Sequence, residues 1–316
     1  MIELQAIQRA ASVIDPYILK TPLRPSGYFS EASGFDVYMK LENWQPTGSF
    51  KIRGALHFAQ TLSARERIQG VVAWSAGNHG LGVAYAAKIF DMPATIFVPA
   101  KTPRSKIEKF RFYPVELSFA PTYEDCEKQG RAFAMKENVT VIHPYDDWRT
   151  VAGQGTVGLE IRQAMPELDA VLVPVGGGGL ISGICIALKT LDPDIRIIGV
   201  QSANSPALSA SLREKHCYEE YPVEHSIAEG LAGGIGKIVY ELAPRYVDEI
   251  INVDEETIKK TVLQLLEQEQ LVVEASGAVT MAALEQVESV PHGSRVAVVI
   301  SGGNLDPALL REILAG

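Results

Sequence analysis

Four short segments of the 316-residue chain carry residues whose types and spacing could do chemistry. The first is PTGSFKIRGA at 46–55, where Lys51 lies among apolar and glycine residues. A lysine that forms a Schiff base must lose its proton near neutral pH, and partial burial or a nearby cation such as Arg53 favours that loss. Taken alone, the segment also fits a surface lysine at the start of a helix.

The second segment is SAGNHG at 75–80. Its small residues expose backbone N–H groups, and the amide of Asn78 can both donate and accept hydrogen bonds. Such a turn at a helix N-terminus can bind a carboxylate, although glycines also occur in turns for reasons of geometry alone. His79 has no acidic residue beside it in the sequence, so we interpret its ring as structural rather than catalytic.

The third segment, VPVGGGGLISG at 173–183, gives the strongest local signal. Four consecutive glycines cost conformational entropy and add little packing. They are expected where backbone N–H groups and a helix N-terminus enclose an anion closely. The spacing fits neither a dinucleotide-binding fingerprint nor a P-loop. It therefore predicts a site for one compact phosphate, with a flexible connection as the alternative.

The fourth segment is VISGGN at 299–304, where Ser301 ends a buried apolar run. A hydroxyl at the end of a strand can face a cleft and hydrogen-bond a ring nitrogen. The alternative interpretation is a serine that caps the N-terminus of a helix.

The elements that must position these segments follow from hydrophobic patterning. Continuous apolar runs predict strands of parallel sheets that are buried on both faces. These runs lie at 71–74, 94–99, 139–144, 170–175, 195–200 and 295–301. Helical patterns alternate with them at 82–90, 156–165, 181–191 and 256–270. The order predicts an α/β protein, and three of the four segments follow strands, where open α/β sheets bind ligands.

Composition narrows the class of protein further. Hydrophobic residues make up 47% and charged residues 21%, as in ordinary globular proteins. No apolar stretch approaches the ~20 residues of a membrane helix, and no signal peptide is recognisable. A net charge of −9 argues against nucleic-acid binding, and three scattered cysteines argue against a disulfide framework. We therefore expect a cytoplasmic protein with neither a nucleic-acid nor a membrane partner.

A reactive lysine, an asparagine turn, a tetraglycine loop and a strand-end serine are together the parts of a pyridoxal-phosphate site. The chain resembles the fold-type II pyridoxal-phosphate enzymes, which share a tryptophan synthase β-like fold. Within them it is most similar to the threonine/serine dehydratase and serine racemase family. The resemblance rests on TPL (21–23), KLEN (40–43), QPTGSFKIRGA (45–55), SAGNHG (75–80), AGQGT (152–156), VPVGGGGLISG (173–183), IAEG (227–230), VVEASGA (272–278) and SGGN (301–304).

The resemblance implies that pyridoxal 5'-phosphate is the cofactor and that Lys51 both binds it and removes the substrate α-proton. No metal ligand is expected, because Gln201 and Ala207 stand where metal-dependent members carry acidic ligands. The implied cofactor-binding residues are Lys51, Phe50, Asn78, Gly176, Gly177, Gly178, Gly179, Leu180, Gly230, Glu274 and Ser301. The implied substrate-binding residues are Ser75, Ala76, Asn78 and His79.

The same resemblance implies two open α/β domains with parallel-rich sheets. Residues 1–66 and 147–316 would form a large cofactor-binding domain, and residues 67–146 a small mobile domain that closes on the substrate. A homodimer or homotetramer is expected. Because the chain ends at Gly316, we expect no C-terminal regulatory domain.

The implied activity is that of a lyase of amino-acid catabolism, a threonine or serine dehydratase (ammonia-lyase). It would convert L-threonine, L-serine or a related β-hydroxy amino acid to a 2-oxo acid and ammonia by α,β-elimination. The alternatives are a serine racemase or another β-elimination or β-replacement enzyme of the family. Ala76 stands where the racemases carry a second serine, the proton donor on the opposite face of the cofactor, and so argues against racemisation.

Overall fold

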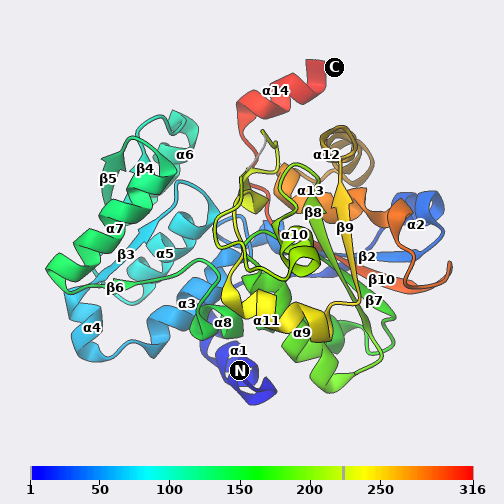
Figure 1. Ribbon diagram of the computed structural model, residues 1–316, viewed down its shortest axis with the longest axis horizontal. Coiled ribbons are helices and arrows are strands. Elements are labelled where there is room, and N and C mark those ends of the chain that lie inside the picture. Colours follow the sequence, from blue (N-terminus) through cyan, green and yellow to red (C-terminus); the bar gives the residue numbers. More distant parts are fainter. Residues whose placement is uncertain (1, 223–224, 316) are drawn as a thin grey trace.

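The computed structural model describes residues 2–222 and 225–315, which form a six-stranded and a four-stranded sheet (Figure 1). The strand orders are β1-β2-β10-β7-β8-β9 and β5-β4-β3-β6. The strands are β1 (Leu23–Pro25), β2 (Asp36–Leu41), β3 (Val71–Trp74), β4 (Ala94–Pro99), β5 (Glu116–Ala120), β6 (Thr140–Val141), β7 (Ala170–Pro174), β8 (Arg196–Ser202), β9 (Glu249–Val253) and β10 (Arg295–Ile300). Only the β1–β2 pairing is antiparallel within the described residues, so the predicted α/β class with two parallel-rich sheets is confirmed.

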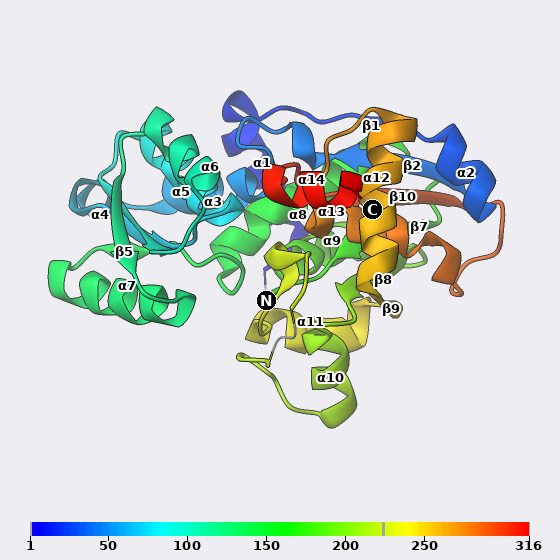
Figure 2. The ribbon, with the colours of Figure 1, turned by 90° about the horizontal axis from the view of Figure 1, so that it is seen from above.

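Helices cover both sheets. Seen from above, the four-stranded sheet with its helices lies beside the six-stranded sheet (Figure 2). The α-helices are α1 (Leu4–Ile14), α2 (Gly27–Ser33), α3 (Lys51–Thr61), α4 (Ala64–Gln69), α5 (Asn78–Ile89), α6 (Arg104–Lys109), α7 (Tyr123–Glu137), α8 (Trp148–Ala164), α9 (Gly179–Leu191), α10 (Ala207–Glu214), α11 (Lys237–Tyr246), α12 (Glu255–Glu269), α13 (Ala275–Ala282) and α14 (Pro307–Ala315). None of the helices in the described part of the chain combines the length and hydrophobicity needed to cross a lipid bilayer.

The central strands read as continuous apolar runs because both of their faces are buried. In β7, Leu172 packs into the core beneath α12 and α13, whereas Val171 and Val173 face the core beneath α9. In β10, Val298 packs into the first of these cores and Ala297 into the second. The four-stranded sheet is covered in the same way, by α5 on one face and α7 on the other. This two-sided burial is typical of parallel sheets.

Several predicted elements differ from those observed. Helix α8 begins at Trp148, eight residues before the predicted start, because the glycine-rich AGQGT segment is helical. A Cβ at Gly153 would lie 2.5 Å from the carbonyl oxygen of Arg53, and one at Gly155 would lie 2.8 Å from that of Gly183. The glycines therefore let α8 pack closely against α3 and α9. The predicted strand at 139–144 shrinks to the two residues of β6.

Strands β3 to β6 all lie between residues 71 and 141, inside the segment predicted as the small domain. The remaining strands come from the two flanking parts of the chain. The boundaries at 67 and 146, and the mobility of the segment, stay predictions.

Candidate active site

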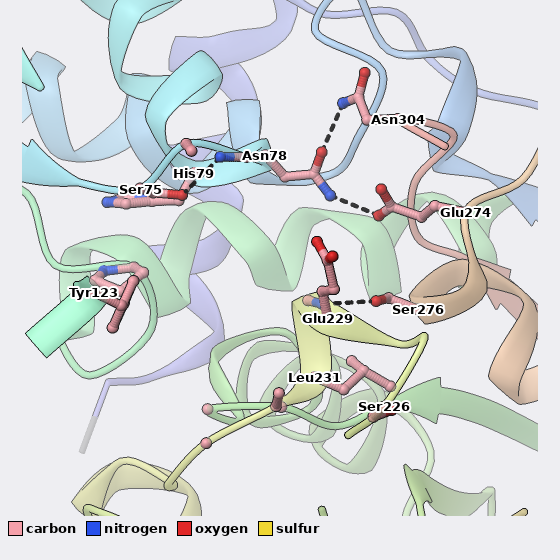
Figure 3. A pocket seen from close by; sticks show the side chains of 18 of the residues that line it. Ser75, Asn78, His79, Tyr123, Ser226, Glu229, Leu231, Glu274, Ser276 and Asn304 are labelled. Carbon is pink, nitrogen blue, oxygen red and sulfur yellow. Dashed lines mark hydrogen bonds between the residues drawn. The ribbon is translucent and has the colours of Figure 1, made fainter. Parts of the chain in front are cut away.

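A pocket of about 1290 Å³ is lined by residues from both sheet units (Figure 3). It brings together the four segments singled out in the sequence. Every candidate site residue lines it: Phe50, Lys51, Ser75, Ala76, Asn78, His79, Gly176, Gly177, Gly178, Gly179, Leu180, Gly230, Glu274 and Ser301.

Lys51 is the first residue of α3, and its amine lies in this pocket. Its Nζ donates a hydrogen bond to the carbonyl oxygen of Pro144 at 3.0 Å and lies 5.2 Å from the ring centre of Phe50. Burial lowers the pKa of the Lys51 amine to about 8, although the negative charge of Glu274 opposes the shift. A sizeable fraction of this amine is therefore unprotonated near neutral pH, as a nucleophile or base requires.

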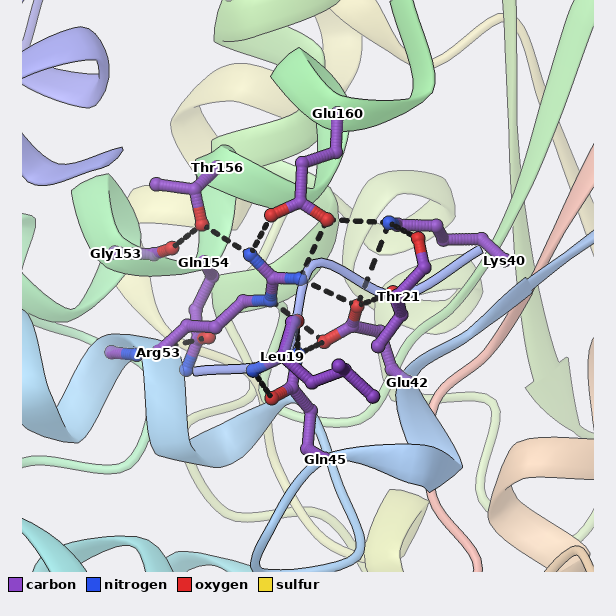
Figure 4. Close-up of polar contacts among 11 residues, drawn as sticks. Leu19, Thr21, Lys40, Glu42, Gln45, Arg53, Gly153, Gln154, Thr156 and Glu160 are labelled. Atoms are coloured by element: carbon purple, nitrogen blue, oxygen red, sulfur yellow. Dashed lines mark hydrogen bonds and ion pairs between the residues drawn. The ribbon is translucent and has the colours of Figure 1, made fainter. Parts of the chain in front are cut away.

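The expectation that Arg53 helps to deprotonate Lys51 was wrong. The guanidinium of Arg53 is fully buried on the other side of α3 and forms two-pronged ion pairs with Glu42 and Glu160 (Figure 4). These carboxylates neutralise its charge, so the lowered pKa of Lys51 is due to burial. No sequence signal showed that two carboxylates would meet this arginine.

Lys40 completes a buried quartet of two cations and two anions, Lys40, Glu42, Arg53 and Glu160. The amine of Lys40 lies 2.5 Å from Glu160 and 4.0 Å from Glu42. Burial alone would raise the pKa of Glu42, but the charge of Arg53 holds it below its usual range. The quartet joins β2, the segment after it, α3 and α8, and so fixes the base of the helix that begins with Lys51.

The tetraglycine loop connects β7 to the N-terminus of α9. A Cβ at Gly177 would overlap the ring of Tyr145, and one at Gly179 would lie 2.8 Å from the Tyr145 backbone. Gly178 has φ +88°, a conformation that side-chain-bearing residues rarely adopt. The loop therefore presents bare backbone at a helix N-terminus, an arrangement suited to a phosphate group.

The SAGNHG turn follows β3 and opens α5. The hydroxyl of Ser75 accepts a hydrogen bond from the backbone N–H of Gly77 at 3.2 Å. The ring of His79 is hydrogen-bonded through Nε2 to the carbonyl oxygen of Ile142 at 2.8 Å. Burial and, next, the charge of Lys51 lower the pKa of His79 to about 3. Its ring is therefore neutral and anchored, in agreement with the structural interpretation.

Ser301 directly follows β10 and is 3% exposed. Its hydroxyl donates to the carbonyl oxygen of Ser276 at 3.4 Å, and the Ser276 hydroxyl accepts from the backbone N–H of Gly230 at 2.9 Å. The next helix begins only at Pro307, so Ser301 is not the helix-capping residue of the alternative interpretation. Its place is the end of a strand at the pocket wall.

The sequence interpretation missed two contacts of Asn78. Its amide lies between Glu274 and Asn304, with 2.6 Å hydrogen bonds to both. Burial raises the pKa of Glu274, while the bond from Asn78 opposes that shift. Asn304 belongs to the SGGN motif, which was the available signal, but no role was assigned to it.

These residues fit pyridoxal phosphate. A buried amine with a lowered pKa suits imine formation with an aldehyde, and the bare glycine loop suits a single phosphate. The hydroxyl of Ser301 can face a ring nitrogen without adding charge. One pocket holds all three features.

Comparison with known proteins decides the family. The model of the family described as "Pyridoxal-phosphate dependent enzyme" matches residues 14–302. The chain belongs to the pyridoxal-phosphate dependent enzyme family. It is 42% identical over 316 residues to the L-threonine ammonia-lyase of Thermotoga maritima, covering 99% of this chain and 78% of that protein. It is 36% identical over 326 residues to the catabolic L-threonine dehydratase of Escherichia coli, covering 98% and 94%.

Solved structures place this pyridoxal-phosphate dependent enzyme in the fold-type II class. The serine racemase of maize superimposes with a TM-score of 0.92 at 31% identity, covering 99% of this chain and 97% of that one. The processed threonine deaminase isoform 2 of Solanum lycopersicum superimposes with a TM-score of 0.92 at 28% identity, covering 98% and 92%. The threonine dehydratase and serine racemase resemblance seen in the motifs is thereby confirmed. The fold alone does not separate lyase from racemase, because it serves both.

Proposed function

We propose that this chain is an ammonia-lyase that converts L-threonine, L-serine or a related β-hydroxy amino acid to a 2-oxo acid and ammonia. The observation that carries the proposal is the meeting of Lys51, Asn78, the tetraglycine loop and Ser301 in one pocket. The similarity to L-threonine ammonia-lyases, which covers 99% and 97% of this chain and 78% and 76% of those proteins, supports this reaction among those that the family performs.

Lys51 is the proposed catalytic residue. Bound pyridoxal phosphate supplies an electron sink for the electron pair left on the substrate α-carbon. With a pKa of about 8, the Lys51 amine can accept the α-proton near neutral pH and pass it on. The carbonyl of Pro144, which holds this amine at 3.0 Å, keeps it at the pocket wall.

Five features would hold the cofactor and substrate. The tetraglycine backbone and the N-terminus of α9 would bind the phosphate, and the Asn78 amide would bind the phenolic oxygen. Ser301 would face the pyridine nitrogen, and Gly230, Phe50 and Leu180 would line the ring. Ser75 and the backbone of its turn would hold the substrate carboxylate at the N-terminus of α5.

We place elimination ahead of racemisation because of Ala76. Racemisation needs a proton donor on the face opposite Lys51, within hydrogen-bond reach of the α-carbon. Ala76 lines the pocket and packs against the apolar core beneath α5. Its methyl group can donate no proton, so expulsion of the β-hydroxyl is the favoured outcome.

We also propose that residues 67–146 move as a small domain. Lys106 of α6 forms a 2.5 Å ion pair with Glu229 from the opposite side of the pocket, and Lys109 bonds Asn304 there. These contacts join the two parts of the chain across the pocket and would break on opening. A homodimer or homotetramer and a cytoplasmic location stay predictions.

The proposed function is tested with a panel of β-hydroxy amino acids of both configurations. Each is incubated with the pyridoxal-phosphate-loaded protein, and 2-oxo acid, ammonia and the enantiomer of the remaining substrate are measured. We expect 2-oxo acid and ammonia in equal amounts from an L-β-hydroxy amino acid. Formation of the D-enantiomer as the main product would contradict the proposal.

A further inference from the structure

A hydrogen-bonded chain of four side chains crosses the pocket, running from Lys109 through Asn304 and Asn78 to Glu274. Lys109 donates to Asn304 Oδ1 at 2.6 Å. Asn304 Nδ2 donates to Asn78 Oδ1 at 2.6 Å, and Asn78 Nδ2 donates to Glu274 Oε1 at 2.6 Å (Figure 3). Lys109 and Asn78 come from the four-stranded sheet unit, whereas Asn304 and Glu274 follow or precede elements of the six-stranded one. The chain therefore alternates between the two sides of the pocket.

The orientation of the Asn304 amide is fixed by two independent contacts. The Lys109 ammonium can only donate, so it requires the oxygen of the amide. The backbone carbonyl of Thr47 can only accept, and it accepts from Asn304 Nδ2 at 2.9 Å. Turning the amide over would place donor against donor and acceptor against acceptor.

This fixed amide determines the orientation of Asn78. Because Asn304 donates through Nδ2, Asn78 must accept through Oδ1. The Nδ2 of Asn78 then faces Glu274. One Nδ2 hydrogen goes to the carboxylate, which leaves the other for a ligand in the pocket. Glu274 accepts hydrogen bonds when it is ionised and can also donate one when it is protonated, so it does not fix the Asn78 amide by itself. The hydrogen bond between Asn78 and Asn304 is the same in both protonation states of Glu274.

Two glycines make room for the chain. A Cβ at Gly48, where φ is +77°, would lie 2.8 Å from Asn304 Oδ1. A Cβ at Gly302 would overlap the Glu274 carboxylate and lie 3.2 Å from Asn78 Nδ2. The backbone is thus shaped around these polar groups.

We propose that Asn304 is a positioning residue that sets the Asn78 amide as a hydrogen-bond donor toward the phenolic oxygen of pyridoxal phosphate. The proposal rests on the role of Asn78 in the proposed function. Asn304 acts through Asn78 because its amide donates to Asn78 from Nδ2. A side chain of the same volume without that donor would not orient Asn78.

The test compares Asn304→Asp with Asn304→Ala. Aspartate keeps the shape and the bond to Lys109 but loses the donor, so Asn78 must turn its Nδ2 toward the new carboxylate. We expect pyridoxal phosphate to bind the Asn304→Asp apoprotein about ten- to a hundredfold more weakly than wild type, the effect of a lost hydrogen bond to a charged group. Alanine removes the bond without reversing it, so the expected loss is smaller, about three- to tenfold.

The relative cofactor affinities of the two variants distinguish a role of the Asn304 hydrogen bond from a role of its volume. If Asn304 only filled space, alanine would be the more damaging change. Asn252→Asp is the matched control, because Asn252 is exposed and its oxygen accepts from the Ser209 hydroxyl at 3.0 Å, whereas its Nδ2 donates to no other group among the described residues. Its cofactor affinity should stay within about twofold of wild type.

Affinity is measured by equilibrium titration of each apoprotein, after circular dichroism and thermal unfolding have confirmed its fold. An Asn304→Asp variant that binds as tightly as wild type, or more tightly than Asn304→Ala, overturns the proposal. Should Asn304→Asp not fold, Asn304→Leu takes its place, because leucine fills the same space without the amide: a loss of affinity at least as large as that of Asn304→Ala supports the proposal, and wild-type affinity in Asn304→Leu overturns it. Failure of the wild type itself to bind pyridoxal phosphate contradicts the proposed function instead.

Discussion

The amine of Lys51 donates a hydrogen bond to the carbonyl oxygen of Pro144, 3.0 Å away and 93 residues along the chain. Lys51 opens α3, whereas Pro144 lies between β6 and α8. A backbone carbonyl holds the amine without neutralising it. Burial can therefore keep its pKa at about 8, whereas an ion pair with a carboxylate would raise it.

The first prediction concerns the pH dependence of Lys51 labelling in the apoprotein. The unprotonated amine is the nucleophile, and a lowered pKa shifts its formation to lower pH. Labelling by pyridoxal phosphate, followed by borohydride reduction and peptide mapping, should reach half its maximum near pH 8. Ordinary lysines should require a pH near 10.4. A midpoint near 10 for Lys51, or a dominant label on another lysine, would be incompatible with this account.

The second prediction concerns the buried quartet behind Lys51. Arg53→Met leaves Glu42 and Glu160 facing Lys40 alone, so one buried negative charge loses its partner. The free energy of unfolding in urea should fall by about 3–5 kcal/mol. Arg104→Met is the control, because it breaks an exposed pair with Glu108 and should leave the free energy of unfolding nearly unchanged. Equal losses in the two variants would show that the quartet stabilises nothing beyond a surface pair.

The sequence predicted which segments meet in the pocket, but not the hydrogen bonds between them. Asn78, the tetraglycine loop and Ser301 follow strand ends, and parallel strands bring such ends to one edge, so their meeting could be anticipated. The contacts of Lys51 with Pro144 and of Asn78 with Asn304 depend on how the two sheet units face each other. No local pattern encodes that arrangement.

Strands β5 and β2 were not predicted from the sequence, for a related reason. In β5, burial is partial along Glu116–Ala120, so no continuous apolar run marks it. In β2, Lys40 is buried by its ion pairs, although a lysine in the sequence suggests exposure. The first two turns of α8 were not predicted as helix because they contain glycines, which here allow close packing against neighbouring helices.

The third prediction is that activity needs no divalent cation. The amide of Gln201 is fully buried, donates weakly to the carbonyl oxygens of Val175 and Ser205 at 3.4 and 3.5 Å, and accepts from the Ser209 N–H at 3.1 Å. A neutral amide offers less to a hard cation than a carboxylate does. A strong chelator should therefore leave turnover unchanged, with chelator presaturated with Mg²⁺ as the control. Loss of activity that Mg²⁺ or Ca²⁺ restores would refute this.

The fourth prediction concerns Ala76. With L-serine, elimination by the wild type should exceed racemisation by about a hundredfold, since a positioned general acid is worth about 10²–10⁴. Ala76→Ser adds a hydroxyl at little cost in volume and should raise the yield of D-serine. Chiral chromatography together with a pyruvate assay measures both products. Comparable D-serine and pyruvate from the wild type would mean that another group protonates the opposite face.

The central claim, that Lys51 and pyridoxal phosphate eliminate the β-hydroxyl of an amino acid, is tested most directly with L-threonine. The loaded wild type and Lys51→Ala are incubated with the substrate, and 2-oxobutanoate and ammonia are followed together. The account predicts that the wild type forms the two products one to one, and that Lys51→Ala forms neither while keeping its fold by circular dichroism. Turnover by Lys51→Ala at the wild-type rate would contradict it, as would threonine epimerisation without 2-oxobutanoate by the wild type.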